Sequence, residues 1–173
     1  MIKFVPITEY TDQMWYEAYL IVYDKKLAFH MGIDPRLINN PPELTTFYEN
    51  IMSEVEAERF FGFAILDDDE YLGHITLHNK IGEWEFGAIL KDPKRWNSGL
   101  GIKAILRALW WVFEEVGRDW AIAFPYSRDE KVEKMLLKGG MKPFANFYVM
   151  DRDTWQSRWA RRASKWVQPH YQQ

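Results

Sequence analysis

Six short segments of the chain, rich in apolar and aromatic residues, are predicted to be β-strands, and the first of them also alternates apolar and polar residues with the period of two that is typical of a strand. These segments cover residues 2–7, 60–66, 71–78, 84–90, 120–124 and 144–150. Elsewhere apolar residues recur every three or four positions, which predicts amphipathic helices. The helices are expected over 14–22, 44–55, 102–116 and 129–138.

Polar residues next to these segments indicate where the helices begin. Thr11 is expected to cap the first helix with its side-chain oxygen. Asn40-Pro41-Pro42-Glu43 predicts the start of the second, because it places a capping Asn before a Pro at the first helical position. Residues 32–39 are predicted to form a loop.

The order of elements is strand, two helices, three strands, helix, strand, helix, strand. This order predicts an α/β (α+β) fold, with a mixed, mostly antiparallel sheet and helices on both faces. Residues 1–150 are expected to form one domain. Residues 151–173 are predicted to form a basic, Trp-rich amphipathic helix or tail.

A glycine-bearing turn, Arg95 to Ile102, joins the strand over 84–90 to the helix that follows it. The free N–H groups of a first helical turn and the helix dipole favour an anion there. Gly99 and Gly101 lack a Cβ, which allows a phosphate to approach the backbone. A Gly-x-Gly pair alone fits an ordinary turn equally well.

Within this turn, Trp96-Asn97-Ser98-Gly99-Leu100-Gly101 resembles the acetyl-CoA pyrophosphate loop of the Gcn5-related N-acetyltransferases (GNAT). That family most often begins the pattern with Arg or Gln. A Trp at this position resembles the ribosomal-protein N-terminal acetyltransferase branch. Pro93 and Gly140-Met141 also stand where the family usually has Pro and Gly-Phe, so the resemblance spans about residues 1–150.

The resemblance implies a central pair of strands, 84–90 and 120–124, that splay apart to hold the pantetheine arm of acetyl-CoA. The pyrophosphate would lie on the N–H groups that open the following helix. The residues expected to bind the cofactor are therefore Ile89, Leu90, Lys91, Arg95, Trp96, Asn97, Ser98, Gly99, Leu100, Gly101 and Ile102. Lys94 and Lys103 are close enough in sequence to add charge-assisted contacts.

Acetyl transfer to an amine requires a proton acceptor. Members of the family commonly use a Glu on the strand before the loop, and Glu85 is in that position here. Trp84 and Phe86 are expected to face away from it, and desolvation of its carboxylate suits a general base. A solvated residue at the sheet surface is the alternative.

His74 and His78 are competing bases, because residues four apart on a strand point to the same face. Both also fit ordinary polar residues of a sheet. The pair does not indicate a metal site, because no Cys or further His lies at ligand spacing.

The family's usual general acid is a Tyr four residues before the Gly of Gly140-Met141, a position that Leu136 occupies here. Tyr126 and Ser127, at the end of the preceding strand, are possible substitutes. The missing Tyr favours a second interpretation, in which the chain is a non-catalytic member of the same fold with a binding or assembly role.

The composition of the chain limits the classes of partner that it is expected to bind. The 173 residues carry a net charge of −3, contain no Cys, and include nine Trp. The negative charge disfavours general nucleic-acid binding, and no apolar run is long enough for a membrane span. The N-terminus does not resemble a signal peptide, so a cytoplasmic location is expected.

The acceptor is expected to be a cationic amine, either a small molecule or a peptide amine. Candidate attracting groups are Glu85, the turn at 67–70, and a run of glutamates with no Lys or Arg between Arg36 and Arg59. These are Glu43, Glu49, Glu54, Glu56 and Glu58. A solvated acidic helix face explains them equally well.

The C-terminal segment carries five Lys or Arg against two Asp, with Trp155, Trp159 and Trp166 at roughly helical spacing. A helix that docks its Trp face on the domain is favoured. A homodimer contact or a nucleic-acid patch is the alternative.

We therefore predict an acetyl-CoA-dependent N-acetyltransferase that works by direct attack in a ternary complex. An acyltransferase acting on tRNA or a modified base is a third interpretation, based only on the basic tail.

Overall fold

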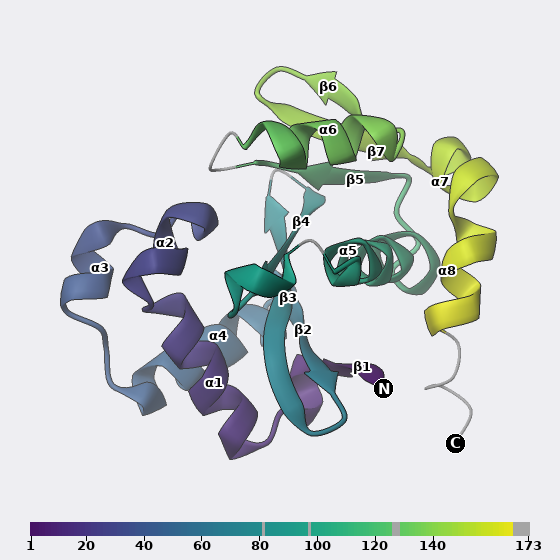
Figure 1. The fold of residues 1–173 in the computed structure, drawn as a ribbon. Coiled ribbons are helices and arrows are strands. Elements are labelled where there is room, and N and C mark those ends of the chain that lie inside the picture. Colours follow the sequence, from purple (N-terminus) through teal and green to yellow (C-terminus); the bar gives the residue numbers. More distant parts are fainter. Residues whose placement is uncertain (81, 97, 126–128, 168–173) are drawn as a thin grey trace.

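The structure is a computed structural model that describes residues 1–80, 82–96, 98–125 and 129–167. Its seven strands form one sheet in the order β1-β2-β3-β4-β5-β7-β6 (Figure 1). The strands are β1 (Ile2–Pro6), β2 (Phe60–Asp67), β3 (Glu70–Lys80), β4 (Glu83–Leu90), β5 (Trp120–Ala123), β6 (Lys142–Phe144) and β7 (Phe147–Asp151). Every pair is antiparallel except β4 with β5.

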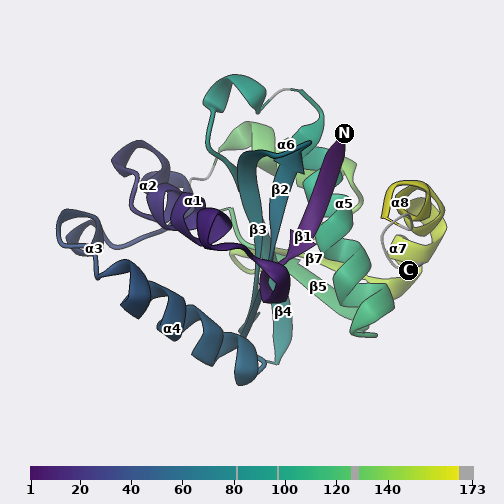
Figure 2. The same cartoon turned by 90° about the horizontal axis from the view of Figure 1, so that it is seen from below.

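Helices cover both faces of the sheet, as predicted (Figure 2). One side holds α1 (Asp12–Val22), α2 (Lys25–Met31), α3 (Pro35–Asn39) and α4 (Leu44–Glu56). The other holds α5 (Leu100–Trp110), α6 (Glu130–Lys138), α7 (Arg152–Arg158) and α8 (Ala160–Val167). Short 3₁₀ turns span Ile7–Glu9 and Pro93–Arg95, and a π-helical turn, Trp111–Glu115, continues α5.

Successive residues of the central strands point to opposite faces of the sheet, so the buried core is divided between the two faces. The larger cluster joins Phe63, Ile75 and Leu77 to the buried side of α5. Two smaller clusters lie under α1, α2 and α4, and Ala64 and Ile89 belong to one of them. The sheet therefore has an α5 face and an α1 face.

Of the two predicted helix starts, one is confirmed and one is wrong. Thr11 does cap α1, because its Oγ1 accepts a hydrogen bond from Met14 N at 3.3 Å. The start predicted at Asn40 is wrong, since α4 begins only at Leu44 and Asn40 instead ends α3. The helical conformation is disfavoured for a residue that precedes Pro, and both Asn40 and Pro41 precede a Pro.

The loop predicted over residues 32–39 is also wrong in part. Asp34 Oδ1 accepts a hydrogen bond from Arg36 N at 2.9 Å and caps α3. The preceding helix, α2, is capped in the same way by Asp24 and ends at Gly32, whose φ is 63°. Both helices are too short to show an apolar period in the sequence.

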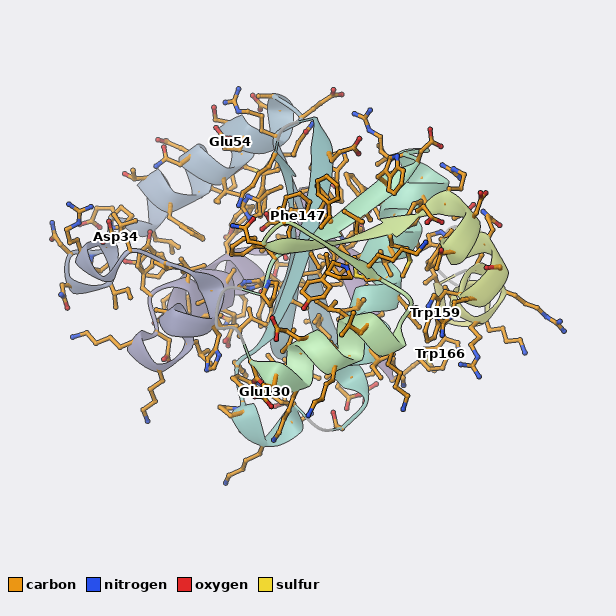
Figure 3. All side chains as sticks on the ribbon, turned by 90° about the horizontal axis from the view of Figure 1, so that it is seen from above. Asp34, Glu54, Glu130, Phe147, Trp159 and Trp166 are labelled. Atoms are coloured by element: carbon orange, nitrogen blue, oxygen red, sulfur yellow. The ribbon has the colours of Figure 1, made fainter. Side chains whose placement is uncertain are left out.

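Residues 152–167, which include Trp159 and Trp166 (Figure 3), pack onto the α5 face. Trp155 is fully buried, stacks on Phe113, and donates its indole N–H to Glu114 Oε1 at 2.6 Å. These residues form two helices rather than one. Helix α7 ends at Arg158 with Trp159 as its C-cap, and α8 begins at Ala160. Trp159 donates its own indole N–H to Gly139 O. The Trp side chains at 155 and 159 are thus docked on the domain.

Among the described residues, no helix is both long and apolar enough to cross a bilayer. In the same ranges, no group of three or more His, Asp or Glu side chains is placed to hold a metal ion.

Candidate active site

The central strands β4 and β5 separate soon after they meet. Their ladder contains only Glu85 opposite Ile122 and Phe86 opposite Ala123, where β5 ends. Strand β4 continues to Leu90, and among the described residues no strand pairs with residues 87–90 on the β5 side. The predicted splayed pair is confirmed.

The register shows which backbone groups face this split. Lys91 N donates to Leu72 O of β3 at 2.9 Å, so the groups of Lys91 point toward β3. Because the direction alternates along an antiparallel strand, Ile89 also faces β3, whereas Leu90 and Ala88 face the split. Ala88 is exposed although its strand is central. The register thus favours Ala88 and Leu90 over Ile89 and Lys91 for pairing with a ligand.

Trp96 lies beside this split. Its indole Nε1–H donates to Leu90 O at 3.1 Å, and its ring packs edge-on against His30 with centroids 4.8 Å apart. Trp96 also contacts core clusters on both faces of the sheet. Trp96, in the position where the family usually has Arg or Gln, therefore binds the carbonyl oxygen of Leu90 at the end of β4, and the Leu90 N–H faces the split.

The N-terminus of α5 follows directly. Gly99 takes a left-handed conformation, with φ at 82°, and offers no side chain to cap the helix. A Cβ added at Gly99 or Gly101 would meet nothing within 4 Å. Ser98 Oγ donates to Arg95 O at 2.6 Å and accepts a hydrogen bond from Leu100 N at 3.4 Å. Asn97, the remaining residue of the predicted loop, lies outside the described residues.

The cations near the loop contact protein groups. Arg95 Nη2 lies 3.2 Å from Glu70 Oε2, and Lys91 Nζ lies 3.5 Å from Glu17 Oε2. Lys103 Nζ lies 5.0 Å from the centre of the Trp166 ring. Because these side chains have partners elsewhere, the backbone N–H groups of α5 are the more direct anion ligands.

Glu85 is buried, with 8% of its surface exposed, on the α1 face of the sheet. Trp84 and Phe86 point the other way into the α5 core, as predicted. Lys80 Nζ lies 3.1 Å from Glu85 Oε2 and 3.3 Å from Oε1. The carboxylate is thus within the protein, close to where β4 and β5 meet, and is held by a half-exposed cation.

His78 lies directly opposite Glu85 in the β3–β4 register. Burial lowers the pKa of His78, and Lys80 lowers it further, while Glu85 and Glu54 act in the opposite direction. The Phe60 ring packs edge-on against the imidazole at 4.9 Å between centroids. A lowered pKa keeps His78 neutral near pH 7, which is the form that accepts a proton.

His74 lies deeper on the same face. Burial lowers the pKa of His74 to about 4. Its Nδ1 is 3.2 Å from the Tyr71 hydroxyl, and Tyr71 belongs to the cluster under α1. This environment is that of a core histidine, and it makes His74 a weaker candidate than His78 for contact with an amine.

The proton donor is the least defined part of the site. Leu136, in the position of the family's Tyr, is buried in the α5-side core. Tyr126 and Ser127 lie outside the described residues. Tyr148, which the sequence analysis missed, stands opposite Ala123 at the end of β5. Burial and Glu133 raise the pKa of Tyr148, so its phenol stays protonated.

Several of the predicted acidic groups are paired with cations. Arg59 pairs with Glu54 at 2.7 Å, and the N-terminal ammonium lies 2.8 Å from both Asp67 and Asp68. The 67–70 turn also lies at the opposite end of β3 from Glu85. Of the predicted attracting groups, Glu85 is the one buried beside the split.

A split sheet beside a helix N-terminus that carries two glycines defines a site for an extended ligand with an anionic end. Known proteins identify that class. Residues 4–142 match the family described as Acetyltransferase (GNAT) domain. The chain belongs to this family.

Solved structures of similar fold agree. An aminoglycoside acetyltransferase AAC(6')-Ib in complex with coenzyme A aligns over 91% of this chain and 97% of its own, with a TM-score of 0.68 and 13% identity. Spermidine N-acetyltransferase from Vibrio cholerae, with CoA and spermine, aligns over 90% and 97%, with a TM-score of 0.73 and 10% identity.

The N-acetyltransferase PseH of Campylobacter jejuni, with acetyl coenzyme A, aligns over 88% and 99%, with a TM-score of 0.59 and 17% identity. A search of the curated proteins finds no match. The chain is therefore an acetyl-CoA-dependent N-acetyltransferase.

Proposed function

We propose that the acceptor is a cationic primary amine, bound on the α1 face beside Glu85, and that Glu85 takes its proton. The observation that carries this proposal is the burial of Glu85 next to the point where β4 and β5 separate. An ammonium group that replaces part of the contact with Lys80 would be attracted by the carboxylate before it loses its proton.

The cofactor would be held by backbone groups. The first N–H groups of α5 would bind the pyrophosphate, and the open spaces above Gly99 and Gly101 leave room for it. Leu90 N–H and the groups of Ala88 would pair with the pantetheine amides. Bound there, acetyl-CoA supplies the activated acetyl group as a thioester.

The remaining chemistry belongs to the chain and the acceptor. The ammonium first gives one proton to Glu85, directly or through one water, and neutral His78, opposite Glu85, would pass it to solvent. The nitrogen then forms the new C–N bond as the C–S bond breaks, and its second proton leaves by the same route. Tyr148 would protonate the leaving sulfur and regain its proton from solvent.

Substituting Glu85 tests the base. Glu85→Gln should lower kcat by about 100-fold, because a positioned base contributes rate of that order, while affinity for desulfo-CoA stays unchanged. Asp153→Asn, at an exposed carboxylate on α7, is the matched control and should leave both values unchanged. Undiminished turnover in Glu85→Gln would remove Glu85 from the mechanism.

A panel of amines tests the acceptor. Spermidine and an aminoglycoside represent the acceptors that the similar structures name, and a peptide with a free N-terminus represents the ribosomal-protein branch. Release of CoA thiol with one member and not the others assigns the class. Acetyl-CoA binding without turnover on any amine of the panel would mean that the acceptor is not a cationic primary amine.

A homodimer contact, nucleic-acid binding through the basic tail, and a cytoplasmic location stay predictions. Light scattering after size exclusion checks the first of these, and salt-dependent retention on heparin checks the second.

A further inference from the structure

Gly87 lies in the interior of β4, on the same face of the sheet as Glu85. Residues two apart on a strand point to the same side, and Gly87 follows Glu85 by about 7 Å. The pairing of β4 with β3 passes through Gly87 without a shift in register, and the backbone there does not take a positive φ. A glycine weakens the interior of a strand, and a bulge, a bend or the close approach of a ligand is the usual reason for one.

Packing does not require a glycine at this position. Apart from its neighbours in the chain, a Cβ added to Gly87 would have one described atom within 4 Å, the Thr76 hydroxyl oxygen, at the ordinary contact distance of 3.4 Å. Gly62, on the other side of Thr76, is different, because a Cβ there would lie 3.0 Å from Ile75 O. A close backbone neighbour therefore explains Gly62, whereas the space above Gly87 has room for a methyl group.

This space has a floor and two ends. Thr76 stands directly opposite Gly87 in the β3–β4 register, and Glu85 and Ile89 border it along β4. Thr76 and Gly87 are half-buried although β3 and β4 are interior strands, whereas Glu85 and Ile89 are buried. The helices on the α1 face therefore leave the Thr76–Gly87 pair partly uncovered.

Gly87 is also the residue at which β4 leaves β5, since Phe86 is the last paired residue. The pyrophosphate position follows Leu90, so the pantetheine arm would run back along β4 and end near Gly87. For the attack, the amine nitrogen and the thioester carbon must come within about 3–3.5 Å of each other. The carbon that carries the amine would then lie over Gly87, between Glu85 and the split.

We propose that Gly87 and Thr76 determine which acceptors fit, and that the space over them admits a primary amine on a branched carbon. The inference rests on the proposed position of the acceptor beside Glu85. A branch of methyl size fills the volume that a Cβ at Gly87 would occupy, and it meets the Thr76 hydroxyl at van der Waals distance. One methyl group in such a pocket changes kcat/KM by about 10–200-fold.

Propylamine and isopropylamine are the probes, because they are isomers that differ in the branch at the carbon next to nitrogen. With acetyl-CoA as the donor, the wild type should release CoA thiol with both amines. Gly87→Ala should lower kcat/KM for isopropylamine by at least about tenfold more than for propylamine. The affinity of this variant for desulfo-CoA should be unchanged, because Leu90 and the N-terminus of α5 keep their geometry.

A second variant fills the same space from the other strand. Thr76→Ile should give the same selective loss, also if Gly87→Ala does not fold, and isoleucine suits a strand. Val5→Ile is the matched control, because it adds one methyl group on the same face of the sheet at the edge strand β1. Its ratio of the two kcat/KM values should equal that of the wild type. A merely structural defect would lower both values together.

Binding is measured separately, in the presence of desulfo-CoA, from the methyl resonance of Thr76 in protein labelled at its threonine methyl groups. Isopropylamine should shift this resonance saturably, with a millimolar dissociation constant, and Gly87→Ala should weaken that binding. The methyl resonance of Thr8, which is exposed in the turn after β1, should not move. Loss of a resonance in Thr76→Ile assigns the Thr76 signal.

The outcomes separate this inference from the proposed function. A saturable Thr76 shift that weakens in Gly87→Ala, without CoA release by the wild type, would support the acceptor space and refute the catalytic assignment of Glu85. An unchanged ratio of the two kcat/KM values in Gly87→Ala and Thr76→Ile would overturn the role of Gly87 and leave acetyl transfer in place. The inference also fails if the wild type uses propylamine and rejects isopropylamine, or if isopropylamine does not shift Thr76.

Discussion

Replacing Gly101 by Glu should raise stability and abolish cofactor binding in the same molecule. Gly101 lies in the first turn of α5, and a Cβ there meets no atom within 4 Å. Removing Gly from a helix contributes about 0.5–1 kcal/mol, and a carboxylate at a helix N-terminus about 0.3–1 kcal/mol more. For a chain of this length the combined gain corresponds to a rise in Tm of about 2–6 °C.

The same substitution should weaken the binding of acetyl-CoA. A carboxylate about 5 Å from a phosphate charge is repelled by about 3 kcal/mol at an effective dielectric constant of 20. That energy weakens binding by about 100-fold. Differential scanning fluorimetry measures the first effect, and calorimetric titration with desulfo-CoA measures the second.

Two variants at the same position separate size from charge. Gly101→Ala should keep part of the gain in Tm and bind desulfo-CoA normally, since a Cβ at this position meets no atom within 4 Å. Gly101→Lys should bind normally but gain less stability, because a cation opposes the helix dipole. If Gly101→Glu bound desulfo-CoA within about threefold of the wild type, the N-terminus of α5 would not be the anion site.

Three further predictions concern stability. Gly73→Ala should lower the free energy of unfolding by about 3 kcal/mol or more in urea titrations, because the new Cβ would lie 2.0 Å from Ile89 O; an unchanged midpoint would contradict the β3–β4 register. Trp155→Ala should cost about 3–5 kcal/mol, since it opens the core and frees Glu114, whereas a loss below about 1 kcal/mol would mean that α7 is not part of the core. His74 has a folded pKa of about 4 against 6.5 for the unfolded chain, so the unfolded state binds more protons between these values. Stability should therefore be full above pH 6.5 and fall by about 3 kcal/mol as the pH drops to 4, and His74→Gln should flatten this dependence.

Most strands and the long helices were predictable because each buries one face and shows it in the sequence. The single strand predicted over 144–150 is wrong, since β6 and β7 form a hairpin there and all residues of β6 are exposed. The segments from 60 to 90 are strands as expected, and Thr11 and Gly99 stand where a cap and a turn were predicted. Helices α2 and α3 were missed, since they depend on the local caps Asp24 and Asp34 rather than on a repeating apolar face.

The site was predictable in place but not in detail. Glu85 faces away from its aromatic neighbours, as alternation requires. The choice between Ile89 and Ala88 depends on how β3 and β4 are aligned, and sequence periodicity does not determine that register. The hydrogen bond from Trp96 to Leu90 depends on the shape of the turn between them. The spacing of apolar residues does not predict the shape of a turn.

The burial of Trp155 and Ala163 has a consequence for synthesis at the ribosome. All strands of the sheet are complete once residue 151 has emerged, yet both residues seal the core beneath α5 from later in the chain. Until residues 152–167 leave the exit tunnel, the apolar surface that receives them stays open to solvent. Nascent chains halted near residue 151 should therefore be the species that chaperones retain and proteases cut.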